Sequence, residues 1–265
     1  MAQGLDLTHL DQWIRDHVPA FDGDLKAEKF AGGQSNPTFK LSAGENSYVL
    51  RRKPMGTLLA SAHAVDREFK VLSALAPTNV PVPTPVALCE DDNVIGSMFY
   101  IMEYLEGRVF WDPALPEVSD KDRAAIYDQM NQVMADMHSV DIHQVGLRDY
   151  GKPGNYFERQ IGRWTKQYRA AEAELIPEME KLIDWLPRNM PADDGRVSLV
   201  HGDYRLDNLI FHPTEPRIIG ILDWELSTLG HPLADLAYQL MAWQFPREAG
   251  ICLLYTSDAA DEWLR

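Results

Sequence analysis

Cysteine, basic residues and long apolar runs are all scarce in this chain. Two cysteines, Cys89 and Cys252, among 265 residues cannot form the disulfide framework of a small secreted domain. No apolar run approaches the roughly 20 residues that a membrane-spanning helix needs. The opening residues, MAQGLDLTHLDQW, contain neither the basic nor the apolar segment of a secretory signal. These absences predict a cytoplasmic protein with no membrane partner.

The shortage of basic residues also excludes a class of partner. Lys and Arg number 25 against 40 Asp and Glu, which gives a formal net charge of −15. Binding to a phosphate backbone requires clustered positive charge, so we expect no nucleic-acid partner. Such acidity can attract a cationic substrate, but it also keeps many proteins soluble, and we prefer the second interpretation.

Apolar residues at helical spacing predict a helix near the start of the chain. These residues are Leu7, Leu10, Ile14 and Val18. Thr8 and Asp11 are expected to supply polar caps. Pro19 is expected to end the helix.

A β-hairpin, a helix and a buried strand are predicted next. Phe39 and Leu41 belong to the first strand of the hairpin, residues 48–52 to the second, and Ala-Gly-Glu-Asn forms the turn. Helical spacing predicts a helix over about 63–75. The apolar run 98–102 is typical of a buried strand.

From residue 120 onward the pattern becomes helical. An apolar stripe with several methionines is more typical of a core than of a cofactor site; its members are Ile126, Met130, Val133, Met134 and Met137. The chain is therefore predicted to be α+β, with a small strand-rich lobe before a mainly helical one. The boundary is expected at residues 104–107.

The segment LVHGDYRLDN, residues 199–208, gathers a histidine, two aspartates and an asparagine after an apolar pair. It is either a solvated turn or a site for a metal and phosphates. Downstream, residues 209–211 and 218–222 predict two strands joined by the turn Pro-Thr-Glu-Pro. Because a hairpin brings its ends together, Asn208 should lie close to Asp223. An amide oxygen beside a carboxylate suits Mg²⁺.

Asp203 is the candidate catalytic base. It is expected to remain free on the loop, where it can contact a substrate hydroxyl. In phosphoryl transfer a carboxylate orients the attacking hydroxyl and accepts its proton, while a metal neutralises the phosphates. His201, Asp203 and Asn208 keep the spacing of H-R-D-x-x-x-x-N in protein kinases, and Asp223-Trp-Glu stands in the place of D-F-G. The pattern predicts a kinase-like site.

The remaining polar residues of this region are given other roles. His201 is predicted to hold the loop through hydrogen bonds rather than to act in catalysis. Asp207, His212 and Glu225 are assigned surface or supporting roles. A metallohydrolase would need His201, Asp203, Asp207 and His212 to converge, whereas the hairpin carries His212 away along a strand.

A kinase-like first lobe should cover a nucleotide. Val49 and Arg51 share one face of their strand, so Val49 can pack on adenine while Arg51 reaches the α- and β-phosphates. Arg51 then replaces the lysine of V-A-I-K, giving a planar fork in place of a point charge. Glu68 is the expected ion-pair partner of Arg51. The alternative makes Glu68 one of several exposed helix acids.

Two other segments complete the expected nucleotide site. Residues 32–36 (GGQSN) stand where a phosphate-binding loop is expected, with Gly33 and Ser35 as contacts. They do not match G-x-G-x-x-G and are equally good turn residues, so the prediction rests on their position in the chain. Glu103 to Leu105 should offer backbone groups to the edge of adenine.

The sequence resembles the aminoglycoside phosphotransferase family of kinase-like enzymes in HGDYRLDN, ILDWE and GHPLADL. Four further segments look like the phosphotransferase domain associated with acyl-CoA dehydrogenases: GGQSNPTF, YVLRRKP, FYIMEYLEGRVF and YGKPGNYFERQIGRWTKQY. The likeness covers residues 30–245.

The resemblance implies a bilobal protein-kinase-like fold, with a nucleotide-binding lobe at 1–104 and a catalytic lobe at 105–251. It implies ATP and Mg²⁺ as cofactors, Asp203 as the base, and Asn208 and Asp223 as metal ligands. For the closer subgroup it suggests a small-molecule hydroxyl acceptor such as a hydroxyacyl-CoA, phosphorylated before elimination, and a functional link to an acyl-CoA dehydrogenase. The lysine usual in the family is replaced here by arginine.

Two other functions remain as alternatives. An antibiotic kinase would use the acidic surface to attract a cationic aminoglycoside. A non-catalytic nucleotide-binding module would have lost Asp203, Asn208 or Asp223, and all three are present.

Residues 252–265 begin with CLLYTSDAADE, which resembles a translated sequencing adapter. We therefore expect a non-native tail there and an incomplete catalytic lobe.

Overall fold

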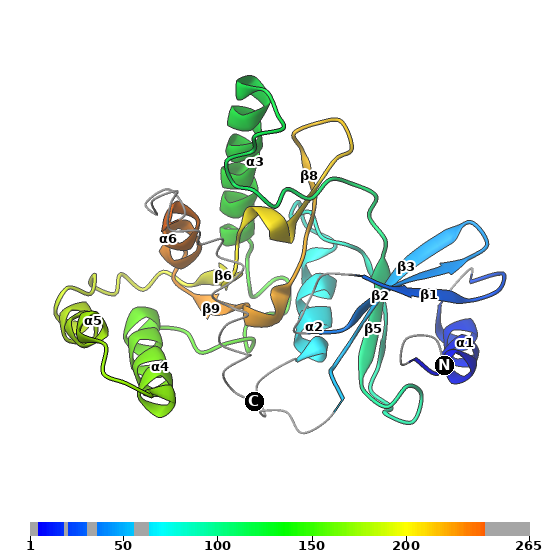
Figure 1. Cartoon of the computed structure of the whole chain (residues 1–265), viewed down its shortest axis with the longest axis horizontal. Coiled ribbons are helices and arrows are strands. Elements are labelled where there is room, and N and C mark those ends of the chain that lie inside the picture. The colour runs from blue at the N-terminus through cyan, green and yellow to red at the C-terminus, as the bar shows by residue number, and fades with distance from the viewer. Residues whose placement is uncertain (1–4, 19–20, 31–35, 56–63, 242–265) are drawn as a thin grey trace.

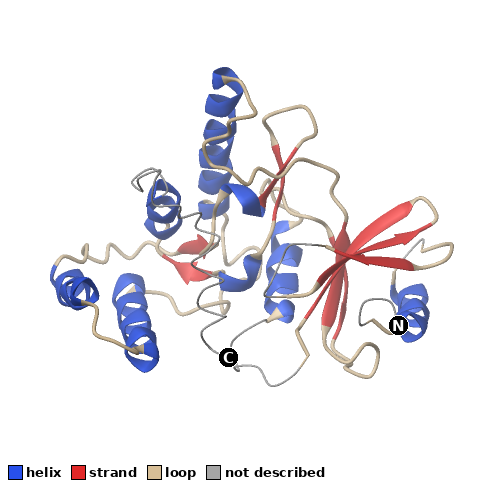
Figure 2. Ribbon diagram, viewed as in Figure 1, coloured by secondary structure: helices blue, strands red, loops and turns tan. Residues whose placement is uncertain are grey.

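The computed structural model describes residues 5–18, 21–30, 36–55 and 64–241. Strands dominate one end of the molecule and helices the other (Figure 2). The strand-rich end is a five-stranded antiparallel sheet in the order β1-β2-β3-β5-β4. Its strands are β1 (Lys26–Lys29), β2 (Thr38–Ala43), β3 (Asn46–Arg52), β4 (Pro85–Cys89) and β5 (Phe99–Glu103). The expected tail at 252–265 lies outside the described residues.

The predicted hairpin is formed by β2 and β3. Phe39 pairs with Leu50 and Leu41 with Tyr48, and Gly44 turns the chain with a positive φ of 57°. Strand β1 was not predicted, because its sequence KAEK shows no apolar alternation. It is an edge strand with mostly exposed side chains, so its pairing with β2 leaves little trace in the hydrophobic pattern.

The two faces of the sheet bury different side chains, as the period of two requires. Leu50 and Ile101 pack in one apolar cluster with helix α1 (Leu7–His17). The cap of α1 corrects the prediction: Asp6 accepts from the backbone N–H groups of residues 8 and 9, at 3.1 and 3.3 Å. Thr8 and Asp11 lie inside the helix, where they cannot cap it.

Helix α2 (Val65–Leu75) lies between the sheet and the second part of the chain (Figure 1). The predicted start at about residue 63 falls outside the described residues. Val49 and Tyr100 point to this side of the sheet and share a core with residues of α2. Glu68 is buried on α2 among apolar residues, so this face carries a charge that needs partners.

The second part contains most of the α-helices and two small sheets. Its helices are α3 (Asp120–His138), α4 (Tyr156–Ala171), α5 (Pro177–Arg188) and α6 (Leu233–Met241). The predicted methionine-rich stripe of α3 is buried, which confirms its core role. No helix in the described ranges is both long and apolar enough to cross a membrane.

The two small sheets hold the segment that the sequence analysis singled out. Strand β6 (Ser198–Val200) pairs with β9 (Thr228–Gly230), and β7 (Leu209–Phe211) pairs with β8 (Ile218–Ile221). The β7–β8 pair confirms the predicted hairpin. The loop 201–208 therefore leaves one small sheet and enters the other, so both of its ends are fixed.

Candidate active site

His201 anchors the loop to the core, as predicted. Its side chain is fully buried, and Nε2 lies 2.9 Å from the Leu222 carbonyl oxygen. Its ring packs against the ring of Trp224. The next residue, Gly202, has a positive φ of 85°, and a Cβ there would meet the Leu226 carbonyl oxygen at 2.9 Å. Only glycine allows the chain to turn this closely past Leu226.

Asp235, near the start of α6, holds the backbone of the same loop. Its buried carboxylate accepts from the backbone N–H groups of His201 (2.9 Å) and Gly202 (2.8 Å). His138 Nε2, at the end of α3, lies 2.9 Å from the same carboxylate. Asp235 lies in the motif GHPLADL, and the sequence alone did not indicate this role. A buried carboxylate shared by two backbone amides fixes the loop against two helices.

Asp235→Asn should lower the free energy of unfolding by about 2–4 kcal/mol. The amide has a similar shape, but its NH₂ group would face buried donors and leave at least one unpaired. Urea unfolding measures the change. The matched control is Asp184→Asn on α5, whose side chain is 76% exposed, and it should stay within about 0.5 kcal/mol of the parent. Equal stability of the two variants would contradict the anchoring role.

Asp203 is held by neighbours, and the expectation that it remains free on the loop is wrong. Its Oδ2 accepts from Asn208 Nδ2 at 2.8 Å, and its Oδ1 accepts from the Tyr238 hydroxyl at 2.8 Å. Arg205 Nε lies 3.3 Å from Oδ1, and the Asp203 side chain is 20% exposed. The turn 206–208 folds Asn208 back under Asp203, which spacing alone did not reveal. Asp203 still reaches the surface.

The hairpin brings Asn208 and Asp223 to the same end of the β7–β8 pair, as predicted. The Leu222 N–H donates to the Asn208 carbonyl oxygen at 2.8 Å, so Asp223 follows directly on a residue bonded to Asn208. Because Asn208 Nδ2 donates to Asp203, the amide oxygen Oδ1 is the end that can face a cation. Asp223 has a positive φ of 63° at the turn. This donor set fits Mg²⁺.

Arg51 connects the sheet to this hairpin. Its Nε lies 3.0 Å from Glu68, its Nη2 lies 2.5 Å from Asp223, and Glu225 is 3.7 Å away. Burial disfavours the charged guanidinium, but the carboxylates of Glu68 and Asp223 hold the pKa of Arg51 above its usual value. The predicted Arg51–Glu68 ion pair is confirmed, and the alternative of an exposed Glu68 is wrong.

Two further side chains, neither of them predicted from the sequence, donate hydrogen bonds to the Glu68 carboxylate. Tyr100 donates its hydroxyl to Oε2 at 3.1 Å, and Asn36 donates Nδ2 to Oε1 at 3.0 Å. Burial raises the pKa of Glu68. A fully buried carboxylate requires several donors, so its burial was the signal that such partners had to exist.

Glu225 contacts residues of the site, so of its two assigned roles, surface or supporting, the supporting one fits. Asn36 Nδ2 also donates to Glu225, at 3.1 Å. Glu68, Asp223 and Glu225 each offer an oxygen within 4.8 Å of the others. No other group of three potential ligands stands so close in the described ranges. The Arg51 guanidinium contacts all three, so a cation already balances these carboxylates.

The residues expected to contact the nucleotide differ in how the structure places them. Val49 is buried on the same side of the sheet as Arg51. The Glu103 N–H donates to the Thr84 carbonyl oxygen at 2.8 Å, so the backbone groups of residues 103–105 that adenine could use do not include this donor. Leu105 packs over Gly220: a Cβ added at Gly220 would lie 2.4 Å from Cδ1 of Leu105. Gly33 and Ser35 lie outside the described residues.

The residues of the metallohydrolase alternative do not converge. His201 Nε2 is directed to a backbone carbonyl. His212 Nδ1 lies near the backbone N–H groups of residues 214 and 215 in the hairpin turn. Asp207 pairs with Arg205 at 3.0 Å, and burial raises the pKa of Asp207. Each of these side chains has a structural partner of its own.

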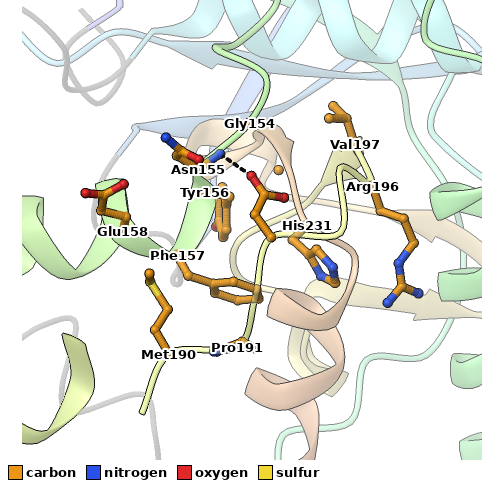
Figure 3. Close-up of a pocket in the computed structure, with 12 residues that line it drawn as sticks. Gly154, Asn155, Tyr156, Phe157, Glu158, Met190, Pro191, Arg196, Val197 and His231 are labelled. Atoms are coloured by element: carbon orange, nitrogen blue, oxygen red, sulfur yellow. Dashed lines mark hydrogen bonds between the residues drawn. The ribbon is translucent and has the colours of Figure 1, made fainter. Parts of the chain in front are cut away.

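A separate hollow lies at the start of α4 (Figure 3). Figure 3 shows Phe157 beside His231, and Asn155 N–H donates to Asp193 at 2.8 Å across the rim. The enclosed space is about 30 Å³, room for about two water molecules. None of the predicted site residues lines it. It is too small for a nucleotide and is not the candidate active site.

Residues 26–263 match the phosphotransferase enzyme family. The chain belongs to this family. It is 48% identical over 246 residues to acyl-CoA dehydrogenase family member 11 of Rattus norvegicus, covering 91% of this chain and 32% of that protein. It is 52% identical over 224 residues to acyl-CoA dehydrogenase family member 10 of Mus musculus, covering 84% and 21%. This phosphotransferase chain thus spans about a third or less of the relatives' length.

Solved structures of phosphotransferases share the fold. A protein of Ralstonia eutropha named for the aminoglycoside phosphotransferases is 56% identical, with a TM-score of 0.82 over 91% of this chain and 71% of its own. Macrolide 2'-phosphotransferase MphH of Brachybacterium faecium is 20% identical, with a TM-score of 0.62 over 87% and 76%. The predicted kinase-like α+β fold is confirmed. Below 25% identity the likeness shows fold alone.

Proposed function

We propose that the chain transfers the γ-phosphoryl group of ATP, in the presence of Mg²⁺, to a hydroxyl group of a small molecule. One observation carries the proposal: Asp203, Asn208 and Asp223 meet at one end of the β7–β8 hairpin, beside the buried Arg51–Glu68 pair. Side chains from three separate segments thereby supply a base, two metal ligands and a phosphate-binding cation. Phosphoryl transfer requires this set.

Asn208 and Asp223 would hold the metal, and Arg51 would bind the phosphates. The ion, when bound, neutralises negative charge on the phosphates. Arg51 uses Nε and Nη2 for Glu68 and Asp223, which leaves Nη1 for a phosphate oxygen among the contacts of the described residues. A guanidinium held on two sides loses little further freedom when it binds a phosphate, so the site is prepared in advance.

Asp203 would act on the acceptor. Its carboxylate accepts from Asn208 and Tyr238, yet each oxygen has a second lone pair, and the side chain remains 20% exposed. An acceptor hydroxyl can therefore donate to Asp203 and pass its proton to the carboxylate as its oxygen bonds the γ-phosphorus, while the bond from that phosphorus to the bridging oxygen breaks and ADP leaves.

For the acceptor, we propose a hydroxyacyl-CoA or hydroxy acid, with a functional link to an acyl-CoA dehydrogenase. Support comes from the rat and mouse relatives, which are named as acyl-CoA dehydrogenase family members and are about three times as long as the matched region or longer. An aminoglycoside is the second candidate. The name of the 56% identical Ralstonia eutropha protein and the net charge of −15 favour it.

The test is ADP release with a panel of acceptors. We expect ADP release with 3-hydroxybutyryl-CoA in the presence of Mg²⁺, and none after EDTA. Butyryl-CoA is the matched control, because it differs only by the missing hydroxyl. Release of equal amounts of ADP with both compounds would contradict transfer to the hydroxyl. Release with kanamycin and not with the thioester would favour the antibiotic kinase.

A further inference from the structure

Helix α6 contacts the catalytic loop at two points one turn apart. Asp235 accepts from the backbone N–H groups of His201 and Gly202, and Tyr238, three residues on, donates its hydroxyl to Asp203 Oδ1 at 2.8 Å. Residues three apart on a helix lie on the same side. One contact holds the backbone of the loop, and the other reaches the carboxylate itself.

The donors to Asp203 come from two directions. Asn208, which donates to Oδ2, and Arg205, whose Nε lies 3.3 Å from Oδ1 as an ion-pair partner, belong to the same loop as Asp203. Tyr238 is the donor, among the contacts of the described residues, that comes from a different element. A carboxylate whose partners all lie on its own loop takes its direction from that loop alone. A donor on a separate helix fixes its direction relative to the core.

The chemistry of Tyr238 suits a permanent donor. Burial, and then the neighbouring Asp203 carboxylate, raise the pKa of Tyr238, so the phenol keeps its proton at neutral and mildly alkaline pH. The side chain is half-buried on α6. A hydroxyl in this place satisfies one lone pair of Oδ1 and leaves the carboxylate able to accept a further hydrogen bond.

We propose that Tyr238 is a positioning residue that fixes the orientation of the catalytic base Asp203 toward the acceptor hydroxyl. The inference rests on the proposed function, since it assumes that Asp203 is the base. Tyr238 touches neither Arg51 nor Asp223 in the contacts of the described residues, so it acts on the acceptor side of the site. Misplacing a catalytic group by about 1 Å can reduce the rate by about 100-fold.

The experiment compares Tyr238→Phe with the parent in Mg²⁺-dependent ADP release. The acceptor is 3-hydroxybutyryl-CoA. If the parent does not use this thioester, ADP release is measured in single-turnover reactions with water as the acceptor. We expect kcat to fall about tenfold, while KM for ATP stays within about twofold. Tyr127→Phe is the matched control, because its hydroxyl bonds the Pro113 carbonyl oxygen and it should keep the parental kcat. An unchanged or increased kcat in Tyr238→Phe would overturn the proposal.

A double-mutant cycle separates positioning from a general structural role. In an Asp203→Asn background, Tyr238→Phe should have no further effect on the single-turnover rate, because it acts through that carboxylate. An undiminished tenfold loss there would overturn the proposal. Tyr238→His restores an N–H donor and should exceed the Phe variant in rate, which tests the donor even if the Phe variant folds poorly. Full activity of Asp203→Ala would instead overturn the proposed function itself.

Discussion

Asp203→Ala should reduce phosphoryl transfer by about 10³-fold and leave ATP affinity within about twofold of the parent. The carboxylate acts on the acceptor, and of its contacts only Asn208 is assigned to the metal. Asn208 Nδ2 also donates to the backbone carbonyl oxygen of Asp203 at 2.9 Å, a bond that remains when the side chain is removed. Single-turnover ADP formation measures the chemical step. Titration with a fluorescent ATP analogue in the presence of Mg²⁺ measures binding.

The control for this prediction is Asp184→Ala. Asp184 is an exposed aspartate on α5, and its ion pair with Arg188 is long, at 3.9 Å. Its replacement should change neither rate nor affinity. If Asp203→Ala lost ATP affinity as strongly as it lost rate, Asp203 would belong to the nucleotide side of the site. The base assignment would then be wrong.

The hairpin was predictable from sequence because its determinants are local. Two apolar strands flank Pro-Thr-Glu-Pro, and a hairpin of any twist brings Asn208 near Asp223. The Arg51–Glu68 pair was predictable for a different reason. Its two members occupy the positions of a known kinase ion pair, and strand parity placed Arg51 on the side that faces α2. Both predictions needed little knowledge of how the elements pack together.

The residues that sequence missed depend on packing between distant elements. Tyr238 and Asp203 are 35 positions apart, and their contact exists because α6 docks beside the loop. Asn36 reaches Glu225 across 189 positions. No spacing rule covers such pairs. A different rule applies to them: a buried charge must have hydrogen-bond partners. The buried Glu68 carboxylate therefore requires donors, although the rule does not say which residues supply them.

Asp203 shows the limit of reasoning from motifs. The kinase spacing identified it as the candidate base, but it said nothing about what holds the side chain. The structure surrounds Asp203 with an amide, a guanidinium and a phenol. A base that is held by two hydrogen bonds and an ion pair is oriented before the substrate arrives, which lowers the cost of reaching a reactive geometry. The loop is accordingly a fixed part of the core.

Asp223→Ala should weaken ATP binding by about 100-fold in Mg²⁺ and far less in EDTA. Asp223 is both a proposed metal ligand and a partner of Arg51 at 2.5 Å. The two roles predict different dependences of ATP affinity on Mg²⁺. Loss of a metal ligand removes the part of the affinity that depends on the ion. Loss of the Arg51 partner disturbs the phosphate-binding cation whether or not the ion is bound.

Isothermal titration with ATP, in Mg²⁺ and in EDTA, distinguishes the two roles. Glu68→Gln is the matched comparison, since Glu68 contacts Arg51 at 3.0 Å but lies outside the proposed metal pair. It should weaken ATP binding to a similar extent under both conditions. If Asp223→Ala behaved like Glu68→Gln, Asp223 would serve only to hold Arg51, and the metal would need a different ligand beside Asn208. A loss confined to Mg²⁺ would instead identify the end of the β7–β8 hairpin as the place where the ion binds.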